Sequence, residues 1–347
     1  PLTFHIKKGT SDPQYKRFLA YYKKRQAHIT RQEREEETGE AVKRKMRNIW
    51  IVKPGELTNR GNGITVIDEV YELDAIIKSE RKHDNGSEKT FIVQLYIDRP
   101  FLYKKRKFDI RHYLMITQIH GLFKAYWFKE GYIRTASYEF DIHNLEREIH
   151  LTNDAVQKYT PLYGRHEPAN KVSYAEFQKY VDTQHPKEKY SFEEQILPRM
   201  RQIALDAVRS TFLKISPERY KHNFEVFGLD FMIDSEFQPW LISQYQPLPR
   251  ACLPVADTHH SADVGPGITS LTGRGLSSTY PLPQHSQASG AGLYPLGARW
   301  ELIFDERVEG KELRQHYRGC KNDLLAAIGD VSDDEVYEDI ANQPIAL

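Results

Sequence analysis

The chain has 347 residues, of which 39% are hydrophobic and 28% charged, an ordinary composition for a globular protein of two or three domains. The net charge of +1 gives no sign of binding to nucleic acid or to a membrane surface. No apolar run is long enough to cross a membrane, and no signal peptide opens the chain. The two cysteines exclude a disulfide framework, so a reducing compartment is expected.

The N-terminal part combines a charged helix with a glycine-rich loop. Residues 14–47 are dense in charge and predict a solvated helix and loop; a basic patch for an acidic partner is the less favoured interpretation. A buried strand over residues 48–54 contains Lys53 and leads into a loop with Gly61 and Gly63. Glycines let backbone N–H groups approach anionic oxygens, and the lysine adds a positive charge. The pattern is weak evidence for phosphate binding, because most such loops are plain turns.

Helix and strand patterns follow. We expect a helix over 71–79 and strands over 90–97, 112–118 and 123–128. In residues 107–111, period-two alternation places Lys107, Asp109 and Arg111 on one face. Such a face belongs either to an edge strand in contact with water or to a site for a polyanion with its metal. We favour the second interpretation, because Lys53 and Asp230 call for the same ligand.

Residues 224–234 and 240–242 predict two antiparallel strands joined by a tight turn. A carboxylate directly after Ile242 would lie across the pair from Asp230 and could share a Mg²⁺ ion with it. The chain has Ser243 at that position.

The remaining patterns concern the architecture. Residues 149–153 predict a strand end or loop with no chemistry of its own. Capping boxes are expected at Ser173 and Ser191. The second opens an amphipathic helix whose predicted core stripe is Ile196, Met200, Ile203, Ala207 and Thr211. Residues 244–297 have the composition of a linker, and the acidic tail over 330–338 is expected to be solvated.

Several of these segments, in this order, resemble the tubulin tyrosine ligase-like family of ATP-grasp ligases over roughly residues 1–242. The matching segments are Trp50–Pro54 with its glycine-rich loop, Val93–Pro100, Arg106–Arg111, Gly131–Thr135, His150–Asn153 and Phe227–Asp234. The resemblance implies an α+β ATP-grasp fold, in which two α+β subdomains sandwich ATP. Residues 1–100 would form an N-terminal remnant and the central subdomain, 101–242 the C-terminal subdomain, and 298–347 a C-terminal segment. The domain that usually precedes them is expected to be largely missing, since the chain begins at Pro1.

The resemblance also implies a function. A carboxylate would be converted by ATP into an acyl phosphate, and an amine would then displace phosphate, which joins tyrosine, glutamate or glycine to the acidic C-terminal tail of tubulin. The implied partners are tubulin and a free amino acid, with ATP and Mg²⁺ as cofactors. We expect a monomer in the cytoplasm, at the cytoskeleton, or in a cilium or flagellum, with no nucleic-acid or membrane partner.

Roles carry over from the family residue by residue. Lys53 and Lys107 would hold phosphates, and Asp230 would bind Mg²⁺ and act in catalysis. Arg111 and Arg134 would steady phosphate or the substrate carboxylates. The other implied nucleotide contacts are Arg60, Gly61, Gly63, Gln94, Leu95, Tyr96, Ile97 and Asp109.

The chain departs from the family at three positions. Leu95 replaces a lysine in the adenine strand, and the second and third metal ligands, a glutamate and an asparagine, are replaced by Ser243 and Tyr245. Codons for residues 243–250, read one nucleotide later, can encode V-N-T-N-P-C-L-E, the sequence that the family has there. Our hypothesis is that residues 243–297 are translated out of frame after the loss of two nucleotides.

Three functional interpretations follow. The first is a tubulin-amino acid ligase. The second is a catalytically impaired member that binds a nucleotide or microtubules, as Ser243 and Tyr245 would imply if the sequence is correct. An ATP-grasp enzyme that acts on a small molecule is a weaker third. For the chain as written we expect no activity, and partial recovery of metal binding when the glutamate and asparagine are restored.

Overall fold

The structure is a computed structural model with a mixed α+β fold, and the strand pairs whose register is described are antiparallel. It describes residues 1–38, 46–55, 61–79, 82, 86, 88–215, 222–245 and 299–316. None of the described helices has the length and apolar character that a membrane span requires.

The chain forms two compact units, which are described separately below. Unit 1 comprises Pro1–Tyr113, Glu130–Ile203 and Phe227–Pro247. Unit 2 comprises Leu114–Lys129, Ala204–Val226 and Leu248–Leu347.

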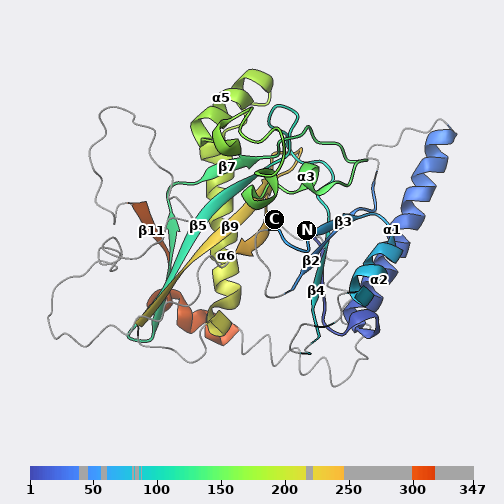
Figure 1. Cartoon of the computed structure of the whole chain (residues 1–347). Helices are drawn as coiled ribbons and strands as arrows, with labels where there is room; N and C mark the ends of the chain where they lie inside the picture. Colours follow the sequence, from blue (N-terminus) through green and yellow to red (C-terminus); the bar gives the residue numbers. More distant parts are fainter. Residues whose placement is uncertain are drawn as a thin grey trace. The chain divides into compact units, whose positions relative to one another are not determined.

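Unit 1 contains a four-stranded sheet of order β1-β4-β2-β3. Its strands are Thr3–Ile6 (β1), Trp50–Pro54 (β2), Thr65–Ile67 (β3) and Phe91–Leu95 (β4). Two helices, Pro13–Glu37 (α1) and Val70–Ser79 (α2), cover one face of this sheet (Figure 1). Trp50 and Val52 are fully buried in that core. Because side chains alternate along a strand, Lys53 is turned to the opposite face, where the candidate site lies.

Helix α1 begins at the start of the charge-dense stretch, as the sequence predicts. Asp12 is its N-cap and accepts a hydrogen bond from the backbone N–H of Gln14. The helix ends at Glu37, within the stretch predicted as helix and loop. Residues 39–45 lie outside the described part of the chain.

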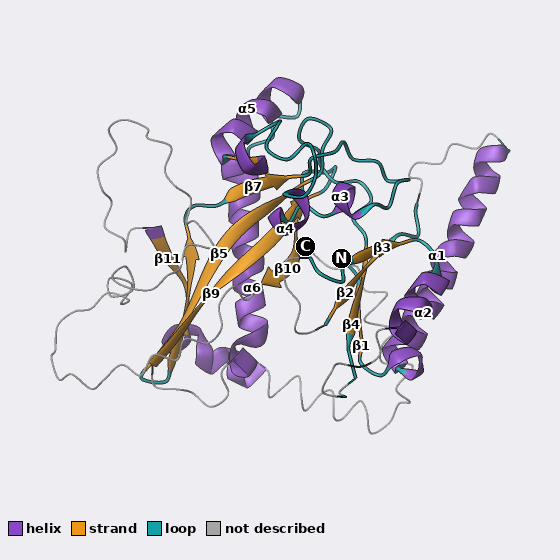
Figure 2. Ribbon diagram, viewed as in Figure 1, coloured by secondary structure: helices purple, strands orange, loops and turns teal. Residues whose placement is uncertain are grey.

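The second sheet has the order β10-β9-β5-β6-β11, with β7 paired to β5 and β8 to β7 (Figure 2). Its strands are Phe108–Ile119 (β5), Leu122–Phe128 (β6), Tyr132–Thr135 (β7), Lys171–Val172 (β8), His222–Ile233 (β9), Pro239–Tyr245 (β10) and Trp300–Asp305 (β11). The prediction of a new strand at His112 is wrong, because β5 is one strand of 12 residues. The edge-strand interpretation of residues 107–111 is also wrong. Asp109 is only 3% exposed, since β7 pairs with this part of β5 on one side.

Short helices join the strands of unit 1. They are Arg147–His150 (α3), Asp154–Gln157 (α4) and Tyr174–Gln184 (α5), with 3₁₀ turns at Gly9–Ser11 and Pro168–Asn170. The predicted strand end or loop at 149–153 is therefore partly helical. Both predicted caps form, since Ser173 accepts from the N–H of Glu176 and Ser191 from that of Glu194.

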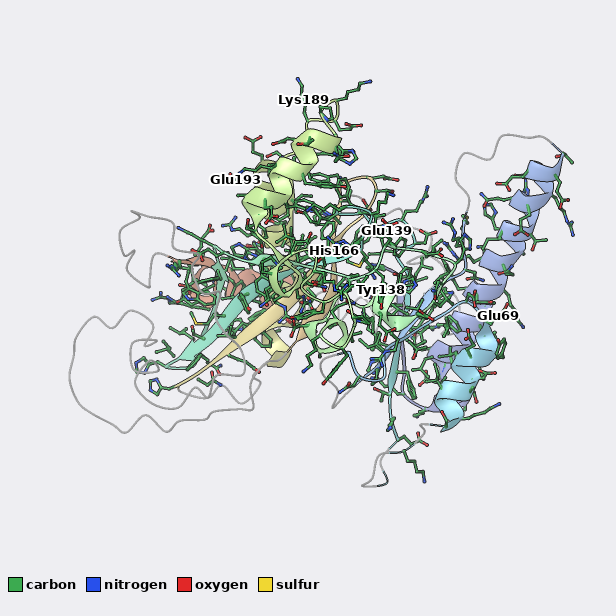
Figure 3. All side chains as sticks on the ribbon, turned by 45° about the horizontal axis from the view of Figure 1, so that its top comes forward. Glu69, Tyr138, Glu139, His166, Lys189 and Glu193 are labelled. Atoms are coloured by element: carbon green, nitrogen blue, oxygen red, sulfur yellow. The ribbon has the colours of Figure 1, made fainter. Side chains whose placement is uncertain are left out.

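A π-helical turn, Phe192–Ile196, leads into the helix Leu197–Ile215 (α6). Its buried stripe is Ile196, Met200, Ala204, Val208 and Phe212. The prediction was correct for the first two positions and wrong after them, because the stripe keeps a four-residue spacing and leaves Thr211 exposed. Beyond α5, Lys189 and Glu193 are both exposed (Figure 3).

Unit 2 is built around a small aromatic core. Strand β6 pairs with β5 from Leu114 to Ile119 and with β11 on its other side. Phe123, Phe212 and Phe304 contact one another, with ring centroids between 5.5 and 6.3 Å apart. The buried carboxylate of Glu306 accepts a hydrogen bond from the N–H of Phe123 at 2.8 Å.

Candidate active site

Most of the residues singled out from the sequence line one pocket within unit 1. They are Lys53, Gln94, Leu95, Tyr96, Ile97, Lys107, Asp109 and Asp230. The apolar side chains Ile51, Ile64, Met232 and Ile242 complete much of its wall. The pocket therefore combines apolar surface with two lysine ammonium groups and two carboxylates.

The two lysines are held by neutral acceptors. Lys53 Nζ donates to Gln94 Oε1 at 2.9 Å and to the carbonyl oxygen of Ile242 at 2.7 Å. Lys107 Nζ donates to the hydroxyl of Tyr96 at 2.9 Å and to the carbonyl oxygen of His150 at 2.7 Å. Burial lowers the pKa of Lys53 to about 8, although Asp230 opposes this effect. Burial, with a contribution from Lys53, lowers the pKa of Lys107 to about 7.

Next to the lysines, two arginines and two aspartates form a buried cluster. Arg134 reaches both oxygens of Asp109 at 2.6 Å and also contacts Asp230 Oδ1 at 2.9 Å. Arg111 donates from Nε to the same Asp230 oxygen at 2.6 Å. Burial opposes ionisation of Asp230, but Arg134 and Arg111 outweigh it and lower its pKa. Asp230 is therefore ionised at neutral pH.

Gly228 makes room for this cluster. It lies in β9, two residues before Asp230, and a Cβ atom placed on it would be 2.8 Å from Arg111 Nη1. A side chain at this position would thus collide with the guanidinium group as it reaches across the strand toward Asp230.

The segment Arg147–Asn153 also supports the pocket, a role that its sequence pattern does not predict. The Arg147 guanidinium donates to the carbonyl oxygen of Gly61 at 2.9 Å. Thr152 donates to Asp109, and His150 holds Tyr96 and Lys107. Two signals point to this segment: the change from apolar to polar residues over 149–153, and the family resemblance of His150–Asn153.

The glycine-rich loop is described in part. Gly61 and Gly63 have φ angles of +80° and +69°, a conformation that glycine adopts without strain. Arg60, which was predicted to contact the nucleotide, lies outside the described residues.

The predicted hairpin and its register are confirmed. Ser243 is the backbone partner of Asp230, after an irregularity between Leu241 and Ser243. Tyr245 pairs with Gly228. The suspected out-of-frame segment lies outside the described residues from position 246 onward.

Comparisons with known proteins show which relatives and which family this chain resembles. The tubulin glycylase 3B of Tetrahymena thermophila is 34% identical over 198 residues, which are 56% of this chain and 16% of that protein. The human protein monoglycylase TTLL8 is 32% identical over 204 residues, covering 57% of this chain and 23% of the relative. The tubulin glycylase 3A of Drosophila melanogaster is 30% identical over 208 residues, which are 56% of this chain and 19% of that protein.

In each case the match spans less than a quarter of the relative's length. The family comparison covers a larger part of the chain. The description "Tubulin-tyrosine ligase family" applies to residues 4–243, which contain the whole pocket except Pro1 and stop where the hypothesis of a broken reading frame begins. The chain belongs to the tubulin-tyrosine ligase family.

Proposed function

We propose that this chain carries the ATP-dependent site of a tubulin-glycine ligase. The observation that carries the proposal is a pair of lysines, the half-buried Lys53 and the buried Lys107, in one pocket with apolar walls. Two ammonium groups held only by neutral acceptors among the described residues favour a ligand with several negative charges. Glycine is proposed as the amino acid because the relatives named above are glycylases.

The pocket suits a nucleoside triphosphate. Lys53 and Lys107 would hold phosphate oxygens, and the apolar side chains around Gln94 to Ile97 would border adenine. We propose an ATP-grasp arrangement, with 1–100 and 101–242 as the contributing subdomains. Leu95, which stands where the family has a lysine, has no side-chain group that could hydrogen-bond to the base.

Asp230 is the described residue that would hold Mg²⁺, since this ion usually takes one or two carboxylates together with substrate phosphates. Its oxygens accept hydrogen bonds from Arg111 and Arg134, so these guanidinium groups would have to turn away first. Within the described residues, no group of three His, Cys, Asp or Glu side chains can hold a metal. When bound, Mg²⁺ would neutralise charge on the phosphates.

The proposed reaction has two steps. A tubulin carboxylate oxygen attacks the terminal phosphorus of ATP, and ADP leaves, which gives an acyl phosphate. The amine nitrogen of glycine then attacks the acyl carbon, loses a proton, and displaces inorganic phosphate to form the amide. Arg111 and Arg134 would stabilise the charge on the transferred phosphate and the substrate carboxylates. Most of the catalytic effect would come from positioning and charge neutralisation.

The test supplies tubulin, ATP and one labelled amino acid at a time to the full chain, and measures ADP release and label in tubulin. For the chain as written we expect no label from any amino acid, because Ser243 and Tyr245 replace two of the family's metal ligands. The Ser243→Glu/Tyr245→Asn variant should incorporate glycine but neither tyrosine nor glutamate, because it restores one oxygen ligand across from Asp230 and a second two residues further along β10. Nucleotide binding without label from any amino acid in both proteins would contradict a ligase and leave a binding protein.

A further inference from the structure

A chain of hydrogen bonds connects Lys107 to the carbonyl group of Asn144. Lys107 Nζ lies 2.9 Å from the Tyr96 hydroxyl oxygen, which lies 2.6 Å from His150 Nδ1. His150 Nε2 lies 2.7 Å from the carbonyl oxygen of Asn144. Tyr96 and His150 are 6% and 1% exposed, so water does not replace these contacts.

The direction of each bond follows from the chemistry of its ends. A carbonyl oxygen only accepts, so His150 Nε2 carries the proton that reaches Asn144. A lysine ammonium only donates, so the Tyr96 oxygen accepts from Lys107. The Tyr96 hydroxyl proton is then directed to His150 Nδ1, which must be unprotonated. Burial, with a contribution from Lys107, lowers the pKa of His150 to about 4, in agreement with a neutral ring.

His150 also holds Lys107 directly, through its carbonyl oxygen at 2.7 Å. Within the part of the chain that the structure describes, Tyr96 and His150 thus take two of the three ammonium protons. The third is available to a ligand in the pocket that Lys107 lines. The other charged groups near Lys107 are Asp109 on β5, which favours its charge, and Lys53 on β2, which opposes it.

We propose that Tyr96 and His150 are positioning residues that act as a pair on Lys107, fixing its ammonium group in the orientation that receives an anionic ligand. The inference rests on the proposed function only for the identity of that ligand, a nucleotide phosphate. It gives the segment around His150 a definite role that the sequence pattern did not suggest.

The deciding measurement is the titration of Lys107, followed by NMR of ¹³C-labelled lysine and assigned with a Lys107→Gln variant. Tyr96→Phe keeps the ring but removes the oxygen that accepts from the ammonium group, so the Lys107 midpoint should fall by about one pH unit. His150→Phe, which removes the acceptor for Tyr96, should also lower it. His150→Gln keeps an acceptor and should recover part of the loss.

Tyr163→Phe is the matched control, since it removes a tyrosine hydroxyl that donates to Asp154 elsewhere in unit 1. Titration of Lys107 should be unchanged in that variant. An unchanged midpoint in both Tyr96→Phe and His150→Phe, with folding intact by circular dichroism, would overturn the inference. A loss of stability alone would show only a structural role and would count against it as well.

ATP binding, measured on the same proteins at pH 6 and pH 8, keeps the two proposals apart. If the midpoint shifts and ATP affinity falls in Tyr96→Phe, both proposals are supported. If the midpoint shifts but the wild-type chain binds no ATP at either pH, the positioning role stands and the proposed function fails.

Discussion

At the scale of single residues, the site holds positive charge on one half-buried and one buried lysine, Lys53 and Lys107. Lys107 is 4% exposed and its described hydrogen-bond partners are neutral oxygens, so its charge is poorly compensated until a ligand arrives. A residue of this kind weakens the fold while it prepares the pocket for an anion.

The free-energy cost of burying the Lys107 charge predicts the effect of Lys107→Met on stability. The folded-state pKa of Lys107, about 7, is below its ordinary value of 10.5, so the unfolded chain binds more protons between those values and stability rises with pH across that window. Replacement by methionine should raise the free energy of unfolding by about 1–4 kcal/mol at pH 7 and flatten this rise. Thermal unfolding from pH 6 to pH 9 checks both effects, with the exposed Lys179→Met as control. A destabilised Lys107→Met protein would refute the argument.

The two lysines also predict proton uptake when ATP binds. Phosphate oxygens raise the pKa of Lys53 and Lys107 from about 8 and about 7, so binding is favoured at low pH and weakens as pH rises above these values. Affinity should fall by up to about tenfold per pH unit for each proton taken up. Calorimetry in buffers of different ionisation enthalpy measures the number of protons taken up when ATP binds. Binding of adenosine, which lacks phosphate, should cause no proton uptake. Equal proton uptake with ATP and with adenosine would contradict the prediction.

Gly228 gives a prediction about packing. Gly228→Ala places a methyl group 2.8 Å from Arg111 Nη1, so the guanidinium group must leave Asp230 or the strand must shift. We expect a loss of about 1–3 kcal/mol in unfolding free energy. In the double variant Gly228→Ala/Arg111→Ala the collision is gone, so the two effects should not add. Additive losses would show that the glycine serves another purpose.

At the scale of elements, α1 shows how a local signal fixes a boundary. Asp12 accepts hydrogen bonds from the backbone N–H groups of Lys7, Lys8 and Gln14, which joins β1 to the start of the helix. Burial opposes its ionisation, but these bonds outweigh it and lower its pKa.

Asp12→Ala should therefore lower the unfolding free energy by about 1–2 kcal/mol at pH 7. Because the folded-state pKa is depressed, the stabilisation is present above the unfolded value near 4 and is lost as pH falls through the folded value. The difference between the two proteins should consequently shrink in acid. Urea unfolding at pH 7 and pH 3 tests this, and an equal difference at both would be evidence against the charged cap.

The elements differ in how far the sequence predicts them. Antiparallel pairing of β9 with β10 follows from alternation and a tight turn, both local. Ser243 lies opposite Asp230 because of the irregularity between Leu241 and Ser243, which alternation does not predict. The support that His150 and Thr152 give to Lys107 and Asp109 joins residues that are distant in sequence, so no local pattern contains it. The prediction of the buried stripe on α6 was wrong after Met200 for a related reason. Ile203 and Ala204 are both apolar, and only the tertiary packing determines that Ala204 is the buried residue.

At the scale of the whole molecule, the family match ends at residue 243, while the chain continues to residue 347. The hypothesis of a lost reading frame predicts that the transcript has two more nucleotides after the Ile242 codon than this sequence implies. Sequencing the transcript decides the matter. An intact frame that encodes Ser243, Gln244 and Tyr245 would end the hypothesis.

The arginine–aspartate cluster constrains how this protein can change over time. Arg111 contacts one aspartate, but Arg134 contacts both Asp109 and Asp230. Within the cluster, a substitution at Asp109 or at Arg111 disturbs one partner, whereas a substitution at Arg134 disturbs two carboxylates and one at Asp230 disturbs two guanidinium groups. Across related sequences, positions 134 and 230 should therefore vary least of the four.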